Sequence, residues 1–237
     1  MERASKAASR LGAYRVERSS RRKSRATFAR AFCDECQHDF LIAYSCKGRG
    51  VCPACNARRM VETAAHLADH VMPRLPVRQW VLSVPKRLRY FLQNDPALQT
   101  LALHLFLRAV EQGLHRCSPG AGPTARIGAV AFIHPFGALL NAHVHFHCVV
   151  VDGVFEADGA GGVRFHEARG IGPETIAAIQ AQVRHRLLSV LARRGVLERE
   201  DAEAMGTWDH GGGFSLDASV RREADDRLGL GRAAASA

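Results

Sequence analysis

The sequence lacks the long apolar segments that would place a protein in a membrane or send it out of the cell. Its 237 residues contain no apolar run approaching the roughly 20 residues of a membrane-spanning helix. Residues 1–32 are rich in arginine and serine, without the apolar core of a secretion signal. We therefore expect a cytoplasmic protein with no membrane partner.

Cysteine is present in an odd number, seven, which together with the missing signal argues against a disulfide framework. Each of two Cys-x-x-Cys pairs can point two thiolates at one ion, and tetrahedral zinc takes four ligands. Fifteen residues separate the pairs, so this spacing predicts a structural Zn²⁺ site made by Cys33, Cys36, Cys52 and Cys55. His38 and Cys46 lie between the pairs outside this geometry, and we do not assign them as ligands.

Acidic residues are outnumbered by basic ones, 23 against 33, which gives a formal net charge of +10. This excess favours a polyanionic partner, with nucleic acid as the first candidate, although charge alone does not separate DNA, RNA and anionic lipid. Residues 1–30 form a basic arm that we expect to be flexible, either contacting phosphates or merely solvated. Four cations around the cysteines favour nucleic-acid contact by the zinc module: Lys47, Arg49, Arg58 and Arg59.

Three histidines alternate with apolar residues in the stretch from residue 141 to 151. Because side chains of a strand alternate between its faces, a strand here would place His143, His145 and His147 on one face. Val144, Phe146, Cys148 and Val150 would then face the core, so packing would hold the imidazoles in place. A single strand histidine is usually only hydrogen-bonded, but three on one backed face predict a metal site.

The order of the remaining elements predicts an α+β fold. A helix expected over 58–72 connects the zinc module, residues 31–72, to a second domain over 73–230. That domain reads as strand, helix, strand, strand, helix, strand, with the strands expected at 77–84, 126–133, 141–151 and 214–220, and the helices at 101–116 and 175–191. This is the βαββαβ order of ferredoxin-like folds, with the histidine strand expected in the centre of the sheet.

Cations followed by aromatic residues come directly after the first expected strand of this domain. Lys86, Arg87 and Arg89 lie beside Tyr90 and Phe91, and such a surface suits a single nucleic-acid strand, whose phosphates need charge and whose bases need stacking partners. The alternative is that the two aromatic residues pack in the core.

Four stretches of the chain, between about residue 30 and residue 230, resemble the bacterial rolling-circle transposases of the IS91-like insertion sequences. They are the zinc pairs with Ser45-Cys46-Lys47-Gly48-Arg49-Gly50-Val51-Cys52-Pro53, the run from Trp80 to Tyr90, the histidine strand, and the run from Trp208 to Ser215. The resemblance implies a zinc-ribbon-like module followed by an HUH nuclease domain, HUH meaning histidine, hydrophobic residue, histidine. It further implies a nucleoid-associated enzyme that cleaves and joins single-stranded DNA at insertion-sequence ends.

The resemblance also implies roles for the histidines. His145 and His147 match the HUH pair best because hydrophobic residues follow them, while His143 and His145 form the alternative frame. The pair would hold Mg²⁺ or Mn²⁺, which polarises the scissile phosphate for attack by a tyrosine. A third ligand is not assigned among Asp152, Glu156, Asp209 and His210.

The tyrosine of such enzymes lies downstream of the histidines, whereas the three tyrosines here are Tyr14, Tyr44 and Tyr90. Together with the small-residue tail over 231–237, this leads us to expect a C-terminally truncated copy that is inactive alone or that works with a full-length transposase. A zinc-dependent DNA-binding remnant without cleavage activity is the second hypothesis. A metal-dependent oxygenase or hydrolase that acts on a small molecule is the third. A cupin would need a glutamate that residues 148–155 do not contain, and an amidohydrolase would place its paired histidines early in a longer barrel.

Overall fold

The computed structural model describes residues 14–17, 28–33, 37–43, 53–136, 142–159 and 161–236. The chain divides into two compact units, residues 1–63 and residues 64–237. The described part of each unit contains both helix and strands, and neighbouring strands are antiparallel in every sheet. The expected α+β class is therefore confirmed. No helix in these described ranges is long and apolar enough to span a membrane.

The described part of the first unit contains a three-stranded sheet. Its strands are β1 (Tyr14–Glu17), β2 (Phe28–Cys33) and β3 (His38–Ala43), hydrogen-bonded in that order. Part of the basic arm expected to be flexible is therefore strand, because Tyr14–Glu17 pairs with the end of β2. Helix α2 (Pro53–His66) follows and starts earlier than expected, and a single π-helical turn, η1 (Leu67–Val71), extends it into the second unit.

The second unit is built on a sheet in which the histidine strand is central. The sheet runs in the order β10-β4-β6-β5, with β9 alongside β4, and every pair is antiparallel. Its strands are β4 (Val77–Ser83), β5 (Ala129–Phe136), β6 (Ala142–Val151), β9 (Ser215–Asp217) and β10 (Arg221–Arg222). The central position predicted for the histidine strand is thus confirmed.

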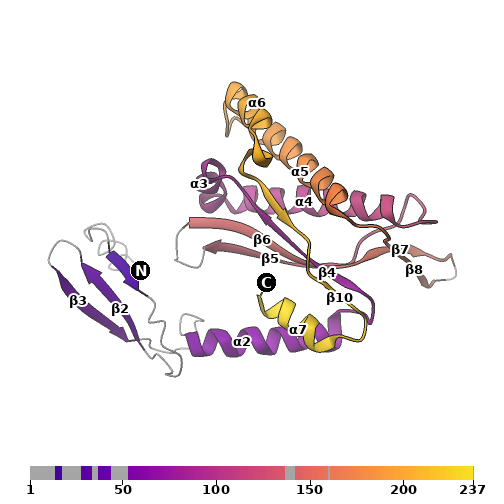
Figure 1. The fold of residues 1–237 in the computed structure, drawn as a ribbon, viewed down its shortest axis with the longest axis horizontal. Helices are drawn as coiled ribbons and strands as arrows, with labels where there is room; N and C mark the ends of the chain where they lie inside the picture. Colours follow the sequence, from indigo (N-terminus) through magenta and orange to yellow (C-terminus); the bar gives the residue numbers. More distant parts are fainter. Residues whose placement is uncertain are drawn as a thin grey trace. The chain divides into compact units, whose positions relative to one another are not determined.

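Four helices lie on one side of this sheet (Figure 1): α3 (Lys86–Asn94), α4 (Pro96–Cys117), α5 (Pro173–Arg193) and α6 (Arg199–Thr207). Pro96 and the side chain of Asp95, which accepts hydrogen bonds from the N–H groups of Ala97 and Leu98, fix the start of α4. The apolar faces of the helices meet the sheet in the main core, which includes Trp80, Leu82, Phe106, Phe146 and Ile179. Helices α4 and α5 were predicted, whereas α3 and α6 were not.

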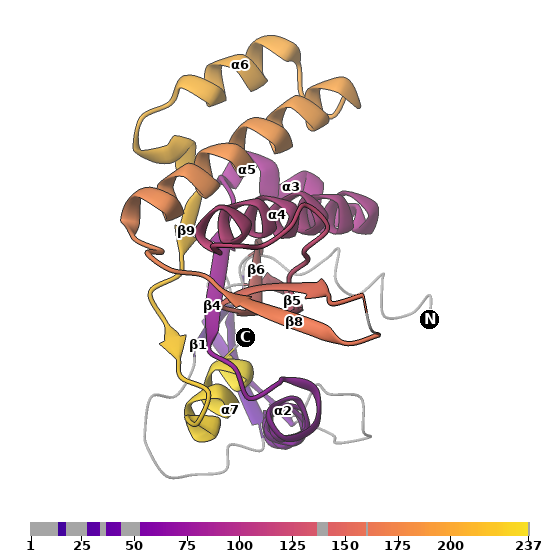
Figure 2. The same cartoon turned by 90° about the vertical axis from the view of Figure 1, so that its right-hand side faces the viewer.

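The opposite side of the sheet is covered at one end of β6 by the turn η1 and by helix α7 (Arg227–Ser236) (Figure 2). Leu230 and Met72 pack there with Val149 and Val151, and the guanidinium of Arg227 donates hydrogen bonds to the carbonyls of Met72 and Pro73. Residues 231–236, expected to form a tail, instead continue α7, consistent with the high helix propensity of alanine.

A hairpin and an ionic cluster close the far end of the histidine strand. The unpredicted strands β7 (Gly153–Ala157) and β8 (Val163–Glu167) form the hairpin. Just before it, the buried carboxylate of Asp152 accepts hydrogen bonds from Arg78 at 3.0 Å and Arg221 at 2.7 Å. Since Arg78 lies in β4 and Arg221 in β10, this carboxylate joins three strands of the sheet.

Candidate functional site

The histidines of β6 lie on one face of the strand, as its alternation predicts. Val144, Phe146 and Cys148 are fully buried in the main core beneath the helices. His143, His145 and His147 are half-buried on the other face, in the part of β6 that precedes the segment packed against α7. The helices thus hold the strand from behind and leave the imidazoles on the opposite face of the sheet.

The neighbouring strand β5 adds a fourth imidazole that the sequence analysis did not single out. His134 is directly paired with His145, and directly paired residues of antiparallel strands share a face. The ring centroid of His134 lies 5.1 Å from that of His145 and 4.7 Å from that of His147. The ring centroids of His145 and His147 are 5.0 Å apart. These four imidazoles, His134, His143, His145 and His147, are called the histidine cluster below.

Hydrogen bonds occupy one nitrogen on each of the two central rings. Nδ1 of His145 lies 2.7 Å from the carbonyl oxygen of His143, so Nδ1 carries the donated proton and Nε2 keeps its lone pair. The side-chain amide of Gln79, on β4, lies 3.3 Å from Nδ1 of His147. The Gln79 atom in this contact is the amide nitrogen, which donates, so Nδ1 of a neutral His147 ring accepts and the ring proton lies on Nε2. In His145, by contrast, Nε2 is the nitrogen that remains as an acceptor for another partner.

A β-bulge lies beside the cluster. The pairing of β5 with β6 shifts between His134 and Phe136, where Pro135 lacks the N–H that a regular ladder would use. Beyond the shift, the rings of His143 and His145 are stacked at 4.9 Å. Bulges re-aim side chains and are frequent next to active sites, which fits the crowding of imidazoles here.

His134, His143 and His147 have lowered pKa values, which favour their neutral form. Burial, with contributions from His134 and His145, lowers the pKa of His147 to about 4. Burial and His145 lower the pKa of His134, and burial, Arg89 and His145 lower the pKa of His143. Neutral imidazole is the form that binds metal ions, so these shifts keep the rings available as ligands at neutral pH.

Arg89 is one of the cations predicted to bind DNA, and its charge lowers the pKa of His143 in the cluster. No other of these cations has such an effect among the residues that the structure describes. Nε of Arg89 donates to the carbonyl of Val84 at 3.0 Å, which fixes the guanidinium near His143. Lys86 is exposed, and Arg87 is paired with Asp201 of α6. Phe91 packs against the core, as the alternative expected, whereas Tyr90 is 71% exposed, as stacking on a nucleic-acid base would require.

The predicted zinc ligands fall largely outside the described residues. Cys33 ends β2 and Cys55 lies in α2, but their side chains are not described, and Cys36 and Cys52 lie outside the described ranges. The same holds for Lys47 and Arg49 and for the side chain of Arg58, while Arg59 is exposed on α2.

Of the four residues considered as a third ligand, the carboxylates of Asp152 and Glu156 are engaged elsewhere. Asp152 binds Arg78 and Arg221 at the opposite end of β6, and Glu156 accepts a hydrogen bond from the N–H of Gly122 and pairs with His166 at 3.3 Å. Asp209 and His210 begin the short helix η2 (His210–Gly213), which packs on α5 and α6. Among the described residues, no three histidine, cysteine, aspartate or glutamate side chains already surround a common point as metal ligands.

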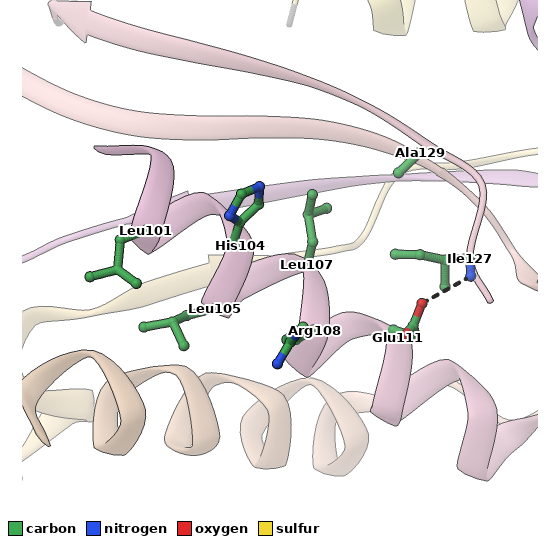
Figure 3. A pocket seen from close by; sticks show the side chains of 8 residues that line it. All are labelled: Leu101, His104, Leu105, Leu107, Arg108, Glu111, Ile127 and Ala129. Atoms are coloured by element: carbon green, nitrogen blue, oxygen red, sulfur yellow. Dashed lines mark hydrogen bonds between the residues drawn. The ribbon is translucent and has the colours of Figure 1, made fainter. Parts of the chain in front are cut away.

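Two hollows are found in the described part of the chain, and no histidine of the cluster lines either of them. One of about 590 Å³ lies between α4 and the start of β5 (Figure 3), where the carboxylate of Glu111 accepts a hydrogen bond from the N–H of Ile127. Ala129 pairs with the core residue Val150, which places this hollow on the helix side of the sheet. A second, of about 730 Å³, lies between α5 and α6. The histidine cluster is instead a feature of the other face.

Comparison with known proteins gives two family matches. Residues 15–84 match the family described as "Transposase zinc-binding domain", of the IS91 type, and this range contains all four cysteines of the predicted zinc site. Residues 128–230 match the family described as "Putative transposase", and this range contains the whole histidine cluster.

The chain is also similar to "Putative transposase y4qJ" of Sinorhizobium fredii, with 31% identity over 132 residues. The similar region covers 54% of this chain and 31% of that protein. No solved structure matches. The chain therefore contains an IS91-type transposase zinc-binding domain followed by a transposase domain.

Proposed function

We propose that the second unit is a ferredoxin-like HUH domain that binds single-stranded insertion-sequence ends and positions them for metal-assisted phosphoryl transfer. The observation that carries this proposal is the histidine cluster on the face of the sheet opposite α3 to α6, with the charge of Arg89 beside it. The strand order, with β6 between β4 and β5, supports the ferredoxin-like assignment.

His145 and His147 are the residues that we propose to hold the divalent ion. Nδ1 of His145 donates to a backbone carbonyl, which is how metal-binding histidines are usually oriented. Turning the amide of Gln79 so that its oxygen faces the ring would let Nδ1 of His147 donate in the same way, which frees Nε2 of both rings for the ion. Their ring separation of 5.0 Å allows both Nε2 atoms to reach one ion. When bound, such an ion polarises a phosphate oxygen as a Lewis acid.

The residues around this pair bind and orient the DNA. Arg89 brings a fixed positive charge to the side of His143, where it can bind a backbone phosphate. Tyr90, exposed on the same helix, offers a face on which an unpaired base can stack. The buried side of β6 holds the imidazoles rigid, which maintains their aim at the phosphate.

Cleavage requires a nucleophile, and no tyrosine follows Tyr90 in this sequence. We therefore propose that these residues bind and orient DNA, and that a tyrosine for covalent chemistry is supplied from outside them, for example by a full-length transposase. The absence of a tyrosine between residues 91 and 237 also favours the second candidate function, DNA binding without cleavage.

The first unit is proposed to hold a structural Zn²⁺ through Cys33, Cys36, Cys52 and Cys55. The match of residues 15–84 to a zinc-binding domain supports this ligand set, because both Cys-x-x-Cys pairs lie within it. Its neighbouring cations, including the exposed Arg59, would add phosphate contacts to those of the second unit.

The test is binding of a fluorescent single-stranded oligonucleotide carrying an insertion-sequence end, with and without Mn²⁺. The zinc-loaded chain should bind more tightly with Mn²⁺, and His145→Ala should lose this enhancement. His104→Ala, an exposed histidine on α4, is the matched control and should retain it. Equal binding by the wild type with and without Mn²⁺ would contradict the proposed role of the cluster.

Covalent chemistry is tested on the same oligonucleotide by denaturing gel. The chain alone should form no protein–DNA adduct, and an adduct should appear when a full-length relative that carries a downstream tyrosine is added. An adduct formed by the chain alone would refute the proposal that its tyrosine comes from elsewhere.

A further inference from the structure

The exposed aromatic side chains of the second unit gather at one end of its sheet. Three of its Phe, Tyr and Trp side chains are exposed among the described residues: Tyr90 (71% exposed), Phe136 (50%) and Trp208 (44%). Phe136 ends β5, and Tyr90 lies in α3, which packs beside the start of β6 (Figure 1). Single exposed apolar residues are common on protein surfaces, but a group of aromatic ones at one end of a sheet indicates a binding surface.

A row of polar residues crosses the sheet at this end. His134 pairs with His145, and His145 pairs with Ser83 at the end of β4. Ser83 in turn pairs with Ser215 at the start of β9. Because directly paired residues of antiparallel strands share a face, these four side chains lie on the face of the histidine cluster. The row therefore extends from the cluster, over two hydroxyl groups, toward the segment that precedes β9.

That segment, residues 208–214, begins with Trp208 and is fixed by helix α5. A guanidinium nitrogen of Arg184 donates a hydrogen bond to the carbonyl of Trp208 at 3.3 Å. The side-chain amide of Gln180 donates to the carbonyl of Phe214 and accepts from the N–H of Leu216, both at 3.1 Å. Two residues one turn apart on α5 thus hold both ends of the segment, so Trp208 is presented from a fixed backbone.

Close packing at Gly213 brings the same segment against the connection between β4 and α3. Gly213 has φ of +75°, and a Cβ added there would lie 3.3 Å from Cβ of Pro85. Lys86 follows Pro85 directly and is exposed, and Arg89 lies about one turn further along α3. Positive charge therefore accompanies the aromatic residues at this end of the sheet, as the binding of a single nucleic-acid strand requires.

Exposed carboxylates limit where the phosphates of such a strand can lie. Asp217 lies on β9 in the next row of the same face, because it pairs with Val81, which pairs with His147. Asp209 is exposed next to Trp208. Both carboxylates repel phosphates, so we expect the backbone to follow the row of Ser hydroxyls, which can donate to phosphate oxygens. The aromatic side chains are then left to contact bases.

We propose that Phe136 and Trp208 are base-stacking residues that hold an unpaired strand on the two sides of the histidine cluster, with its phosphates over Ser83 and Ser215. Every base has a π-face, so aromatic side chains bind single strands with little regard to sequence. Cations and hydroxyls separate the aromatic residues, which fits a nucleic acid better than an apolar protein partner, whose site would be one contiguous patch. This inference rests on the proposed function, because it concerns the DNA of the same site.

Intrinsic fluorescence of the zinc-loaded full chain tests the role of Trp208. The chain has two tryptophans, and Trp80 is fully buried, so a change of emission on binding an oligonucleotide reports on Trp208. Oligothymidylate, without added divalent ions, should quench this emission, whereas its duplex with oligodeoxyadenylate should not, because paired bases are not free to stack. This measurement uses the wild-type chain and does not depend on the folding of a variant.

Variants separate stacking from a structural role. In anisotropy measurements with a fluorescent oligothymidylate, Trp208→Ala and Phe136→Ala should each weaken binding at least about fivefold, because one base loses its stacking partner. Trp208→Phe keeps an aromatic ring, so it should bind within about twofold of the wild type but without the quenching. Val163→Ala removes an exposed apolar side chain of the β7–β8 hairpin and should bind like the wild type.

The outcomes distinguish this proposal from the proposed function. Unchanged emission of Trp208 while anisotropy shows binding, or equal quenching by the duplex, would overturn the stacking proposal and leave the DNA-binding function standing. Binding by either folded alanine variant within about twofold of the wild type would also overturn it. The absence of any binding to single strands would contradict both.

Discussion

His134 and His145 face each other across strands β5 and β6, with their rings 5.1 Å apart. The candidate site is therefore a property of a strand pair, and the register of that pair decides its composition. A slip of one residue would turn His134 toward the helices and remove it from the cluster. The bulge at Pro135 lies directly beside this pair and helps to fix the register.

The titration of His147 gives the first prediction. Because its pKa is lowered to about 4 in the fold, the ring should stay neutral until the pH falls well below the usual value of 6.5. On acidification, the unfolded chain binds this proton at a higher pH than the folded chain does. The contribution of neutral His147 to the free energy of unfolding is therefore fully present above about pH 6.5 and is lost as the pH falls through about 4. An NMR titration of labelled histidine, without divalent ions and with the signal assigned by His147→Gln, measures the midpoint. A midpoint near 6.5 would show that the ring is not desolvated.

The two faces of β6 give the second prediction. Phe146 is fully buried, so Phe146→Ala should lower the free energy of unfolding by about 3–5 kcal/mol. His145→Ala, on the opposite face of the same strand, should change it by no more than about 1 kcal/mol. Urea denaturation of both variants is the measurement. Equal losses in the free energy of unfolding would mean that the core does not pack on the Phe146 face of β6 alone.

Much of this site could be predicted from the sequence because strand alternation and hydrophobic patterning are local. They correctly gave the shared face of His143, His145 and His147, and the central position of their strand. His134 was missed because the strand that contains it was expected to end at residue 133, whereas β5 continues to Phe136. Its pairing with His145 is a matter of hairpin register, which depends on the connecting residues and on packing from other elements.

Other misses have similar physical reasons. The ion pairs of Asp152 join residues 69 and 74 positions apart in the sequence, so no local pattern could show that this carboxylate is engaged. Helix α3 is a short segment rich in cations, and only the burial of Leu88 and Leu92 against the core reveals its amphipathic face. Strand β1 lies in a stretch dominated by arginine, where charge suggested an unstructured arm but pairing with β2 orders the backbone.

The buried carboxylate gives the third prediction. Asp152→Asn leaves the guanidinium groups of Arg78 and Arg221 without their shared counter-charge and should cost about 3 kcal/mol of stability. Glu203→Gln removes the exposed pair with Arg199 on α6 and is the control, expected to cost no more than about 0.5 kcal/mol. Thermal and urea unfolding compare the two. A loss for Asp152→Asn as small as that of the control would refute the role assigned to the cluster around Asp152.

Gly206 and Gly212 give the fourth prediction, because substitution by alanine should change stability in opposite directions at the two positions. Gly212 has φ of +64°, and an added Cβ would lie 2.9 Å from the carbonyl oxygen of Met205, so Gly212→Ala should destabilise by at least about 1–2 kcal/mol. Gly206 lies in helix α6 with open space around it, so Gly206→Ala should stabilise by about 0.5–1 kcal/mol. The shift of the urea midpoint measures both, and a stabilising Gly212→Ala would contradict the backbone conformation at this turn.

The central claim is that the histidine face of the β5–β6 pair, opposite α3 to α6, is where a metal ion and a DNA phosphate meet. The most direct test is anomalous diffraction from crystals of the chain grown with a single-stranded insertion-sequence end and Ni²⁺ or Mn²⁺. The account predicts an anomalous peak about 2.0–2.3 Å from Nε2 of both His145 and His147, with a phosphate oxygen on its open side. A metal peak elsewhere, or a DNA strand bound across the helix side with the histidine cluster empty, would contradict it.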